Sequence, residues 1–244
     1  MAGVAGLLLF PAVLALAQPA PVRSPSPSPS PAGLAPAAVR AVEAAISATM
    51  SAEHIPGLSV AVVTHGEVQW SSGYGQSDVE NAVPASAETV YRLASVSKPI
   101  TAVAAMQLAE QGKLDLDAPV QKYVAVFPQK PWPVTTRALL GHLAGIRHYA
   151  EGEFESTRHY NTLMEALHLF QDDPLVQEPG TKYLYSTYGY TLVGVVVEAI
   201  VGTPFAEQVK KAVFEPAGMT GARVDDVFEI VLAAYSRTSG PRVS

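Results

Sequence analysis

The segment of residues 187–202, TYGYTLVGVVVEAIVG, places apolar side chains on nearly every face of a helix. A helix without a polar face has to be buried among other elements. A chain of 244 residues is long enough to bury a sizeable core. We therefore expect a folded domain with this helix in its interior.

Two further patterns indicate secondary structure before residue 90. Apolar residues recur at a helical period between Val39 and Met50, which predicts an amphipathic helix that begins near Ala37. Residues 57–75, GLSVAVVTHGEVQWSSGYG, contain two short apolar runs on either side of His65-Gly66. This arrangement is typical of a β-hairpin.

The rest of the chain is predicted to be mainly helical. A long helix should run from about Ser95 to Gln111, with Gly112 as its C-cap. Residues 113–177 are interrupted by prolines and contain short helical pieces, so we expect a mostly helical insertion. Residues 205–219 are interpreted as one more amphipathic helix.

These elements amount to one antiparallel hairpin among several helices. Only one hairpin is convincing, and an isolated hairpin is marginally stable in water. The pattern leaves two alternatives. Either the fold is almost entirely helical, or further strands of its sheet lie beyond Ser244.

The composition excludes several functional classes. The chain contains no cysteine, which excludes disulfides, thiolate metal sites and a cysteine nucleophile. Its 16 basic and 22 acidic residues give a net charge of −6, and no window is rich in Lys or Arg, so we expect no nucleic-acid partner. The sequence matches no P-loop, zinc-protease helix or dinucleotide fingerprint, and we expect no cofactor.

Two histidines and two glutamates lie close together in the sequence, at His142, His148, Glu151 and Glu153. Their spacing matches no helical pattern of metal ligands. We therefore expect no metal site, and we interpret His142 as a hydrogen-bonded helix residue.

The N-terminal segment predicts export. The apolar run Val4–Leu16 has the length of the h-region of a signal peptide, and Ala15-Leu16-Ala17 offers small residues for cleavage. The run is too short for a transmembrane helix, which needs about 20 apolar residues. No Lys or Arg precedes Arg23, so a weak, uncleaved anchor is the alternative. We expect an exported protein, periplasmic or extracellular, with a signal peptide at 1–17, a Pro/Ser-rich linker at 18–36 and one domain at 37–244.

Ser95 and Lys98 stand three residues apart at the start of the predicted long helix, where their side chains share one face. A serine hydroxyl becomes a nucleophile when a base takes its proton. Lysine can act as this base where burial or a helix N-terminus disfavours its ammonium form. The alternative is that Ser95 or Ser97 caps the helix and Lys98 is a surface residue.

The surroundings of this pair favour the catalytic alternative. Residues 92–123, RLASVSKPITAVAAMQLAEQGKLDLDAPVQKY, resemble the active-site helix of the serine β-lactamase and penicillin-binding protein superfamily, which carries a Ser-x-x-Lys motif. Residues 179–202 resemble its second motif region, which is usually Tyr-x-Asn in class C-like members and reads Tyr-Ser-Thr here. A Tyr-Ser-Thr form also occurs in a mitochondrial branch of the superfamily and in its bacterial relatives. LLGHLAGI at 139–146 and FEPAGM at 214–219 resemble further segments in the expected order.

The resemblance implies an α/β (α+β) fold of the β-lactamase/transpeptidase type, in which an antiparallel sheet is flanked by helices. It also implies a serine hydrolase that acts on peptide, amide or ester bonds through an acyl-enzyme. Ser95 would be the nucleophile, Lys98 its proton acceptor and Tyr185 a second base or proton relay. Thr187 stands where the superfamily usually has a substrate-binding Asn. Because a hydroxyl replaces an amide there, we expect a peptidase or esterase, acting on a peptide or small molecule, rather than a β-lactamase.

The third motif of the superfamily, Lys-Thr-Gly or His-x-Gly, is not found in the sequence, and Arg237-Thr238-Ser239-Gly240 is only a faint look-alike. We therefore expect a C-terminally truncated domain that lacks sheet strands and is poorly stable. Turnover should be weak or absent, because losing one oxyanion donor typically costs roughly 10²–10³ in rate. The alternative function is a non-catalytic or vestigial binding module.

Overall fold

A computed structural model describes residues 33–156 and 158–224. The chain divides into two compact units, and the boundary between them in the sequence lies between Thr89 and Val90. The predicted signal peptide, most of the predicted linker and the segment 237–240 lie outside the described residues. The two units are described separately below.

The first unit contains the predicted hairpin. Strands β1 (Gly57–Thr64) and β2 (Glu67–Asp78) pair antiparallel, and the short β3 (Val83–Pro84) extends the sheet in the order β1-β2-β3. The two turn residues between β1 and β2 both have positive φ angles, 53° at His65 and 80° at Gly66. A turn of this kind matches the right-handed twist of the two strands.

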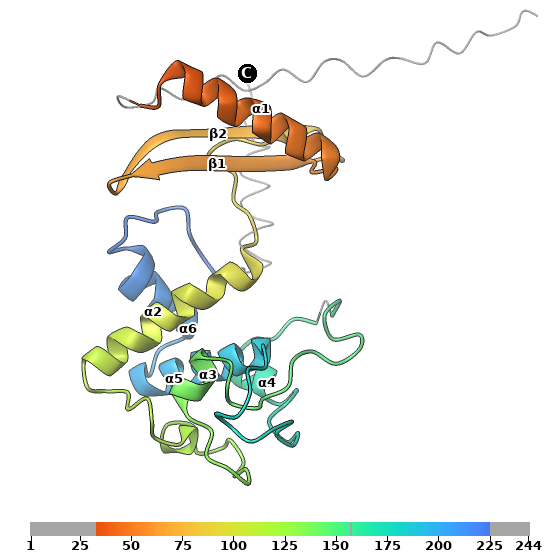
Figure 1. Cartoon of the computed structure of the whole chain (residues 1–244). Coiled ribbons are helices and arrows are strands. Elements are labelled where there is room, and N and C mark those ends of the chain that lie inside the picture. The colour runs from red at the N-terminus through yellow and green to blue at the C-terminus, as the bar shows by residue number, and fades with distance from the viewer. Residues whose placement is uncertain (1–32, 157, 225–244) are drawn as a thin grey trace, which may run out of the picture. The chain divides into compact units, whose positions relative to one another are not determined.

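Helix α1 (Pro36–Ala52) lies along this hairpin (Figure 1). Its predicted apolar face is the less exposed one: Ile46 is buried, and Val39, Val42 and Met50 are half-buried. The hydroxyl of Tyr74 on β2 also donates a 3.4 Å hydrogen bond to Glu43. The amphipathic pattern was therefore a correct guide to which face of α1 is covered.

The second unit is helical in its regular structure (Figure 1). A 3₁₀ turn, Ala94–Val96, leads into α2 (Ser97–Glu110), and Gly112 follows that helix with a φ of 69°. The predicted insertion contributes the 3₁₀ turn Val120–Lys122 and two short helices, joined by long irregular segments. The elements after α2 are α3 (Thr136–Leu140), α4 (Leu163–Leu167), α5 (Thr187–Val201), α6 (Phe205–Val209) and the π-helical turn Lys210–Phe214.

Helix α5 is the centre of this unit, as its sequence predicts. Leu192, Val193 and the run Val195–Val197 are buried, and α5 contacts α2, α3, α4 and α6. Ser186 caps its start by accepting a hydrogen bond from Gly189 N–H, and Gly202 ends it in the left-handed conformation. Because α5 is packed on several sides, the position of its first residues is fixed as well.

Two predicted helices differ in detail. The long helix begins at Ser97 rather than Ser95, because the preceding turn is 3₁₀. The helix expected over 205–219 is α only as far as Val209 and then widens into the π-helical turn.

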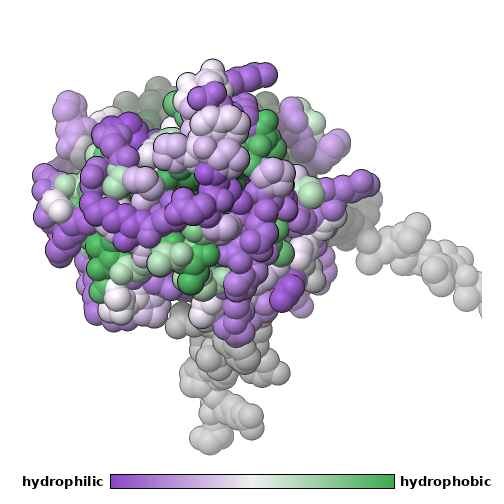
Figure 2. All heavy atoms as spheres, turned by 90° about the horizontal axis from the view of Figure 1, so that it is seen from below, coloured by the Kyte–Doolittle hydropathy of each residue, from purple (hydrophilic) through white to green (hydrophobic). Residues whose placement is uncertain are grey.

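Among the described residues no single helix is long and apolar enough to cross a membrane; α5 and the following Phe205–Phe214 segment pass this test only as a pair, with an 82° bend between them. The face seen from below in Figure 1 is covered mainly by hydrophilic residues, with apolar residues between them (Figure 2). Single apolar residues at a protein surface are ordinary.

Candidate active site

Ser95 and Lys98 lie together where the 3₁₀ turn runs into α2. The Nζ atom of Lys98 donates a 3.2 Å hydrogen bond to Ser95 Oγ. The N-cap of α2 is Val96, and no side chain caps the helix, so Ser95 is not a helix cap. Ala94, directly before Ser95, has a φ of 45°, a conformation that costs a non-glycine residue about 1–2 kcal/mol. Such strain is found most often at functional sites.

Tyr185 approaches the same hydroxyl from the start of α5. Its Oη atom is 2.5 Å from Ser95 Oγ, and Lys98 Nζ lies 4.8 Å from the centre of its ring. Interaction with Lys98 first, and with Ser95 second, lowers the pKa of Tyr185, while partial burial opposes the change. Ser95 therefore contacts an amino group and a phenol whose pKa lies below its ordinary value.

Thr187, the first residue of α5, completes the group. Its Oγ1 atom accepts a 3.3 Å hydrogen bond from Lys98 Nζ. All four residues predicted from the sequence, Ser95, Lys98, Tyr185 and Thr187, are therefore brought together, although about 90 residues separate the two motifs.

Two histidines also border Tyr185. The ring of His142 lies 4.6 Å from the Tyr185 ring, and that of His148 lies 5.3 Å from it. Each accepts a backbone hydrogen bond at Nδ1, His142 from Ser186 N–H at 3.1 Å and His148 from Thr187 N–H at 3.3 Å. The expectation for His142 was wrong in one respect, because this residue follows the end of α3 with a φ of 57° and is not helical.

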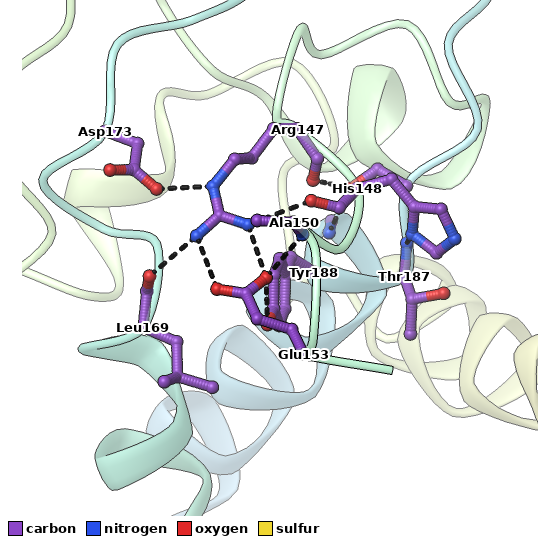
Figure 3. A network of polar contacts seen from close by, with 10 residues as sticks. Arg147, His148, Ala150, Glu153, Leu169, Asp173, Thr187 and Tyr188 are labelled. Carbon is purple, nitrogen blue, oxygen red and sulfur yellow. Dashed lines mark hydrogen bonds and ion pairs between the residues drawn. The ribbon is translucent and has the colours of Figure 1, made fainter. Parts of the chain in front are cut away.

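A network of hydrogen bonds and ion pairs among partly buried side chains supports the segment that carries these histidines (Figure 3). The guanidinium of Arg147 pairs with both oxygens of Glu153, at 2.7 and 3.1 Å, and with Asp173 at 2.5 Å. The Tyr188 hydroxyl donates to Glu153 at 3.0 Å. The hydrogen bond from Arg147 holds the pKa of Glu153 at about 2, and burial raises the pKa of Tyr188 to about 12. The carboxylate of Glu153 is thus paired with Arg147 and Tyr188.

The backbone on either side of this network is also paired. Leu184 N–H donates to His142 C=O at 2.8 Å, and Val176 N–H donates to Gly145 C=O at 2.9 Å. Ser186 Oγ donates to Arg147 C=O at 2.7 Å. Residues 142–147 therefore run beside residues 176–186 and set the position of Tyr185.

A small cavity of about 200 Å³ opens beside Lys98. The hydroxyl-bearing residues Thr101, Thr187 and Thr191 line one part of it, and Leu163 and Phe205 line another. The cavity beside Lys98 is therefore lined by both polar and apolar side chains.

Residue patterns in the sequence did not indicate that His142, His148 or Arg147 lies at or supports the candidate active site. The segment LLGHLAGI, residues 139–146, contains His142 and is the sequence signal that could have pointed to it, whereas His148 lies outside this segment. Their contacts with the second motif join residues about 40 positions apart, and no local pattern reports such contacts.

The geometry can be compared with known proteins. The profile of the beta-lactamase family matches residues 42–240. The chain belongs to the beta-lactamase family. This confirms the resemblance seen in the sequence, and with it the predicted fold of helices and antiparallel strands.

Individual members of the beta-lactamase family agree with this assignment. The human mitochondrial serine beta-lactamase-like protein LACTB is 34% identical over 225 residues, which covers 64% of this chain and 41% of that protein. This chain thus spans less than half the length of this curated relative. The octameric penicillin-binding protein homologue from Pyrococcus abyssi superposes with a TM-score of 0.67 at 32% identity, covering 75% of this chain and 43% of that one. EstCE1, a hydrolase with promiscuous acyltransferase activity, superposes with a TM-score of 0.67 at 31% identity, covering 74% and 51%.

Proposed function

We propose that this protein is a serine hydrolase that forms an acyl-enzyme on Ser95. The observation that carries the proposal is the double contact of the Ser95 hydroxyl, 2.5 Å from the Tyr185 phenol and 3.2 Å from the Lys98 ammonium. A serine hydroxyl held between a donor and a potential base is the arrangement that nucleophilic catalysis requires.

The hydrogen bonds suggest the path of the proton. Because Lys98 donates to Ser95 Oγ, the hydrogen of the serine is left to point towards Tyr185. Tyr185, as a phenolate, accepts this proton while Oγ attacks a carbonyl carbon, and Lys98 in its neutral form is the alternative acceptor. The proton then passes to the leaving amine or alcohol, which departs and leaves the acyl group on Ser95. Attack by water, with the same groups taking its proton, releases the acid.

The proposed substrates carry a peptide, amide or ester bond. Thr187 offers a hydroxyl where class C-like members usually offer an amide, so we expect weaker recognition of the β-lactam amide than of esters. The hydrolase EstCE1 and the penicillin-binding protein homologue among the relatives support this range of acyl groups.

Covalent labelling tests the proposal. A fluorophosphonate probe should add to the full chain at one site, and peptide mass spectrometry should place it on Ser95. Ser95→Ala should abolish labelling, whereas Ser51→Ala, a change on the exposed side of α1, should leave it unchanged. Failure to label Ser95 in the folded protein would refute the hydrolase and favour a binding module.

A second measurement separates acylation from turnover. With a p-nitrophenyl ester in excess we expect a burst of about one p-nitrophenol per chain, followed by a slow steady state. The burst is expected because the acyl-enzyme on Ser95 accumulates before water hydrolyses it. The chromogenic cephalosporin nitrocefin should be opened more slowly than the ester. Faster opening of nitrocefin would contradict the substrate range proposed for Thr187.

A further inference from the structure

His142 and His148 contact Tyr185 on two sides. The His142 ring is inclined by 35° to the Tyr185 ring at 4.6 Å, and the His148 ring meets it edge-on, at 87° and 5.3 Å. Both histidines are half-buried and lie on the segment that Arg147 holds in place. Their position leaves little freedom for the phenol that reaches Ser95.

Both histidines act as hydrogen-bond acceptors from the main chain. The donors are the N–H groups of Ser186 and Thr187, the two residues that follow Tyr185. A backbone N–H can only donate, so the Nδ1 atom of each ring is unprotonated and, in the neutral ring, the hydrogen is on Nε2. Two consecutive peptide groups after Tyr185 are therefore fixed by neutral imidazoles.

Lys98 is the charged group that faces both rings, and its positive charge favours their neutral state. His142 faces Lys98, His148 and the rings of Tyr183, Tyr185 and Tyr190, while His148 faces Lys98, Tyr149 and Tyr185. The carboxylate of Glu153, on the same segment, is paired with Arg147. Partial burial first, and the positive charge of Lys98 second, lower the pKa of both histidines.

We propose that His142 and His148 are positioning residues that hold the Tyr185 phenol against Ser95 only while both rings are neutral. Protonation places a hydrogen on Nδ1, opposite a backbone N–H. The hydrogen bond is then lost, two donors face each other, and the turn that carries Tyr185 has to shift. The inference rests on the proposed hydrolase function, since it concerns how that site is assembled and turned off by acid.

The pH dependence of Ser95 labelling by the fluorophosphonate probe tests this role. In the unaltered chain the rate should fall by more than about tenfold as the pH drops through the range in which the histidines become charged, because each lost backbone hydrogen bond is worth up to roughly a factor of ten. The double variant His142→Asn, His148→Asn keeps an acceptor oxygen near the Nδ1 position and cannot be protonated. It should label at neutral pH at a rate within a few-fold of the unaltered chain. It should also lose the part of the fall that follows the titration of the histidines, whereas the part that comes from protonation of Tyr185 itself should remain.

Matched variants keep the test specific. Asn is one of the residues that tolerate the left-handed conformation of His142, and His54→Asn makes the same change at another residue with a positive φ, in the other unit. The His54→Asn profile should equal that of the unaltered chain. His142→Ala, which has no acceptor, should label about tenfold more slowly at neutral pH, and this difference should shrink as the pH falls and His142 becomes charged in the unaltered chain. An unchanged acid limb in the double Asn variant would overturn the proposal.

Nuclear magnetic resonance of the histidine rings gives a readout that does not need activity. With ¹⁵N-labelled protein at neutral pH, both rings should show an unprotonated Nδ1 and a protonated Nε2, and the Tyr185 ring signals should move as the histidines titrate. A protonated Nδ1 at neutral pH, or Tyr185 signals that ignore the titration, would overturn the inference. Absence of Ser95 labelling at every pH would refute the hydrolase function, and this spectrum would still decide whether the histidines position Tyr185.

Discussion

At the scale of single residues, the Ser95 hydroxyl has two different neighbours with different roles. Lys98 also donates to Thr187, so one ammonium group connects both motifs. Tyr185 is the group whose pKa is moved towards the neutral range by these contacts. Removing either connection without changing the shape of the side chain should therefore affect acylation more than folding.

Tyr185→Phe removes the phenol oxygen but keeps the ring between His142 and His148. The rate of Ser95 labelling should fall by roughly 10²–10⁴, which is the usual contribution of a general base. Tyr74→Phe, in the first unit, serves as the matched control and should label normally. Labelling of Tyr185→Phe within a few-fold of the unaltered chain would assign the base role to Lys98 alone.

Thr187→Val replaces a hydroxyl by a methyl group of similar size. The ammonium of Lys98 then loses an acceptor, and a hydrogen bond to a charged group is worth about 1.5–3 kcal/mol, so labelling should slow by roughly 10- to 100-fold. Thr187→Ser retains the hydroxyl and should stay within a few-fold of the unaltered rate. Equal rates for the Val and Ser variants would show that this contact does not orient Lys98.

At the scale of elements, α5 and the segment 142–147 position the site together. The buried helix fixes the place of Thr187, and the Arg147 network fixes the loop whose histidines bind the turn before α5 (Figure 3). The short elements α3 and α4 contribute by packing against α5. The loops are therefore as important for the geometry as the helices that carry the motifs.

Glu153→Gln tests the network through its dependence on pH. The pKa of Glu153 lies at about 2 in the folded chain, against an ordinary value of 4.5. An unfolded chain then binds more protons between these values, so the stabilisation is complete above about pH 4.5 and is lost as the pH falls towards 2. Urea unfolding should show this loss in the unaltered chain.

In the Gln variant the loss assigned to Glu153 should be absent, and the free energy of unfolding at neutral pH should be lower by roughly 1–3 kcal/mol because Arg147 keeps only part of its partners. Glu155→Gln, at an exposed position nearby, is the control and should unfold like the unaltered chain. A Gln variant as stable as the control would mean that the network does not hold the loop.

Gly145→Ala tests the pairing of the two backbone segments. Gly145 has a φ of 71°, and a Cβ atom there would lie 2.3 Å from Gln177 C=O. Gly152 has a φ of 78° with no atom within 4 Å of a built Cβ, so Gly152→Ala measures the conformational cost alone. That cost should be about 1–2 kcal/mol of unfolding free energy, and Gly145→Ala should cost clearly more. Similar losses in the two variants would show that the segments can separate without cost.

At the scale of the whole molecule, two units of different character follow one another in the chain. The first has the three-stranded sheet and α1, and the second has the complete Ser95–Lys98–Tyr185–Thr187 group. Within the described residues, the candidate site is therefore built inside one unit.

Export is a proposal at the same scale. We propose that residues 1–17 are a signal peptide and that cleavage follows Ala17, because an apolar run of h-region length precedes small residues. Expression in a bacterium with a periplasm should yield a chain that begins at Gln18, as measured by intact mass. Leu8→Arg interrupts the apolar run and should leave the precursor uncleaved. A full-length mass for the exported unaltered chain would support an uncleaved anchor instead.

Several features followed from local sequence alone. The uniform apolarity of residues 187–202 predicts the buried α5, and the His65-Gly66 pair between two apolar runs predicts the β1–β2 hairpin. The helix and the hairpin depend on residues close in the chain, which is why pattern and spacing describe them. Ser95 and Lys98 were indicated by their spacing together with the resemblance of their surroundings to the superfamily, and Tyr185 and Thr187 by the resemblance of residues 179–202 to its second motif region.

Only the tertiary structure decided the contacts between motifs and their support. The 2.5 Å approach of Tyr185 to Ser95 depends on packing between α2 and α5. The Nδ1 contacts of His142 and His148, and the pairing of Arg147 with Glu153 and Asp173, depend on how two loops run side by side. In helices and strands the side chains point in directions that repeat along the sequence, but in an irregular segment they do not. A sequence pattern therefore cannot predict which loop side chains meet. Residue identity therefore determined which chemistry is available to this protein, and long-range packing decided which of those groups meet.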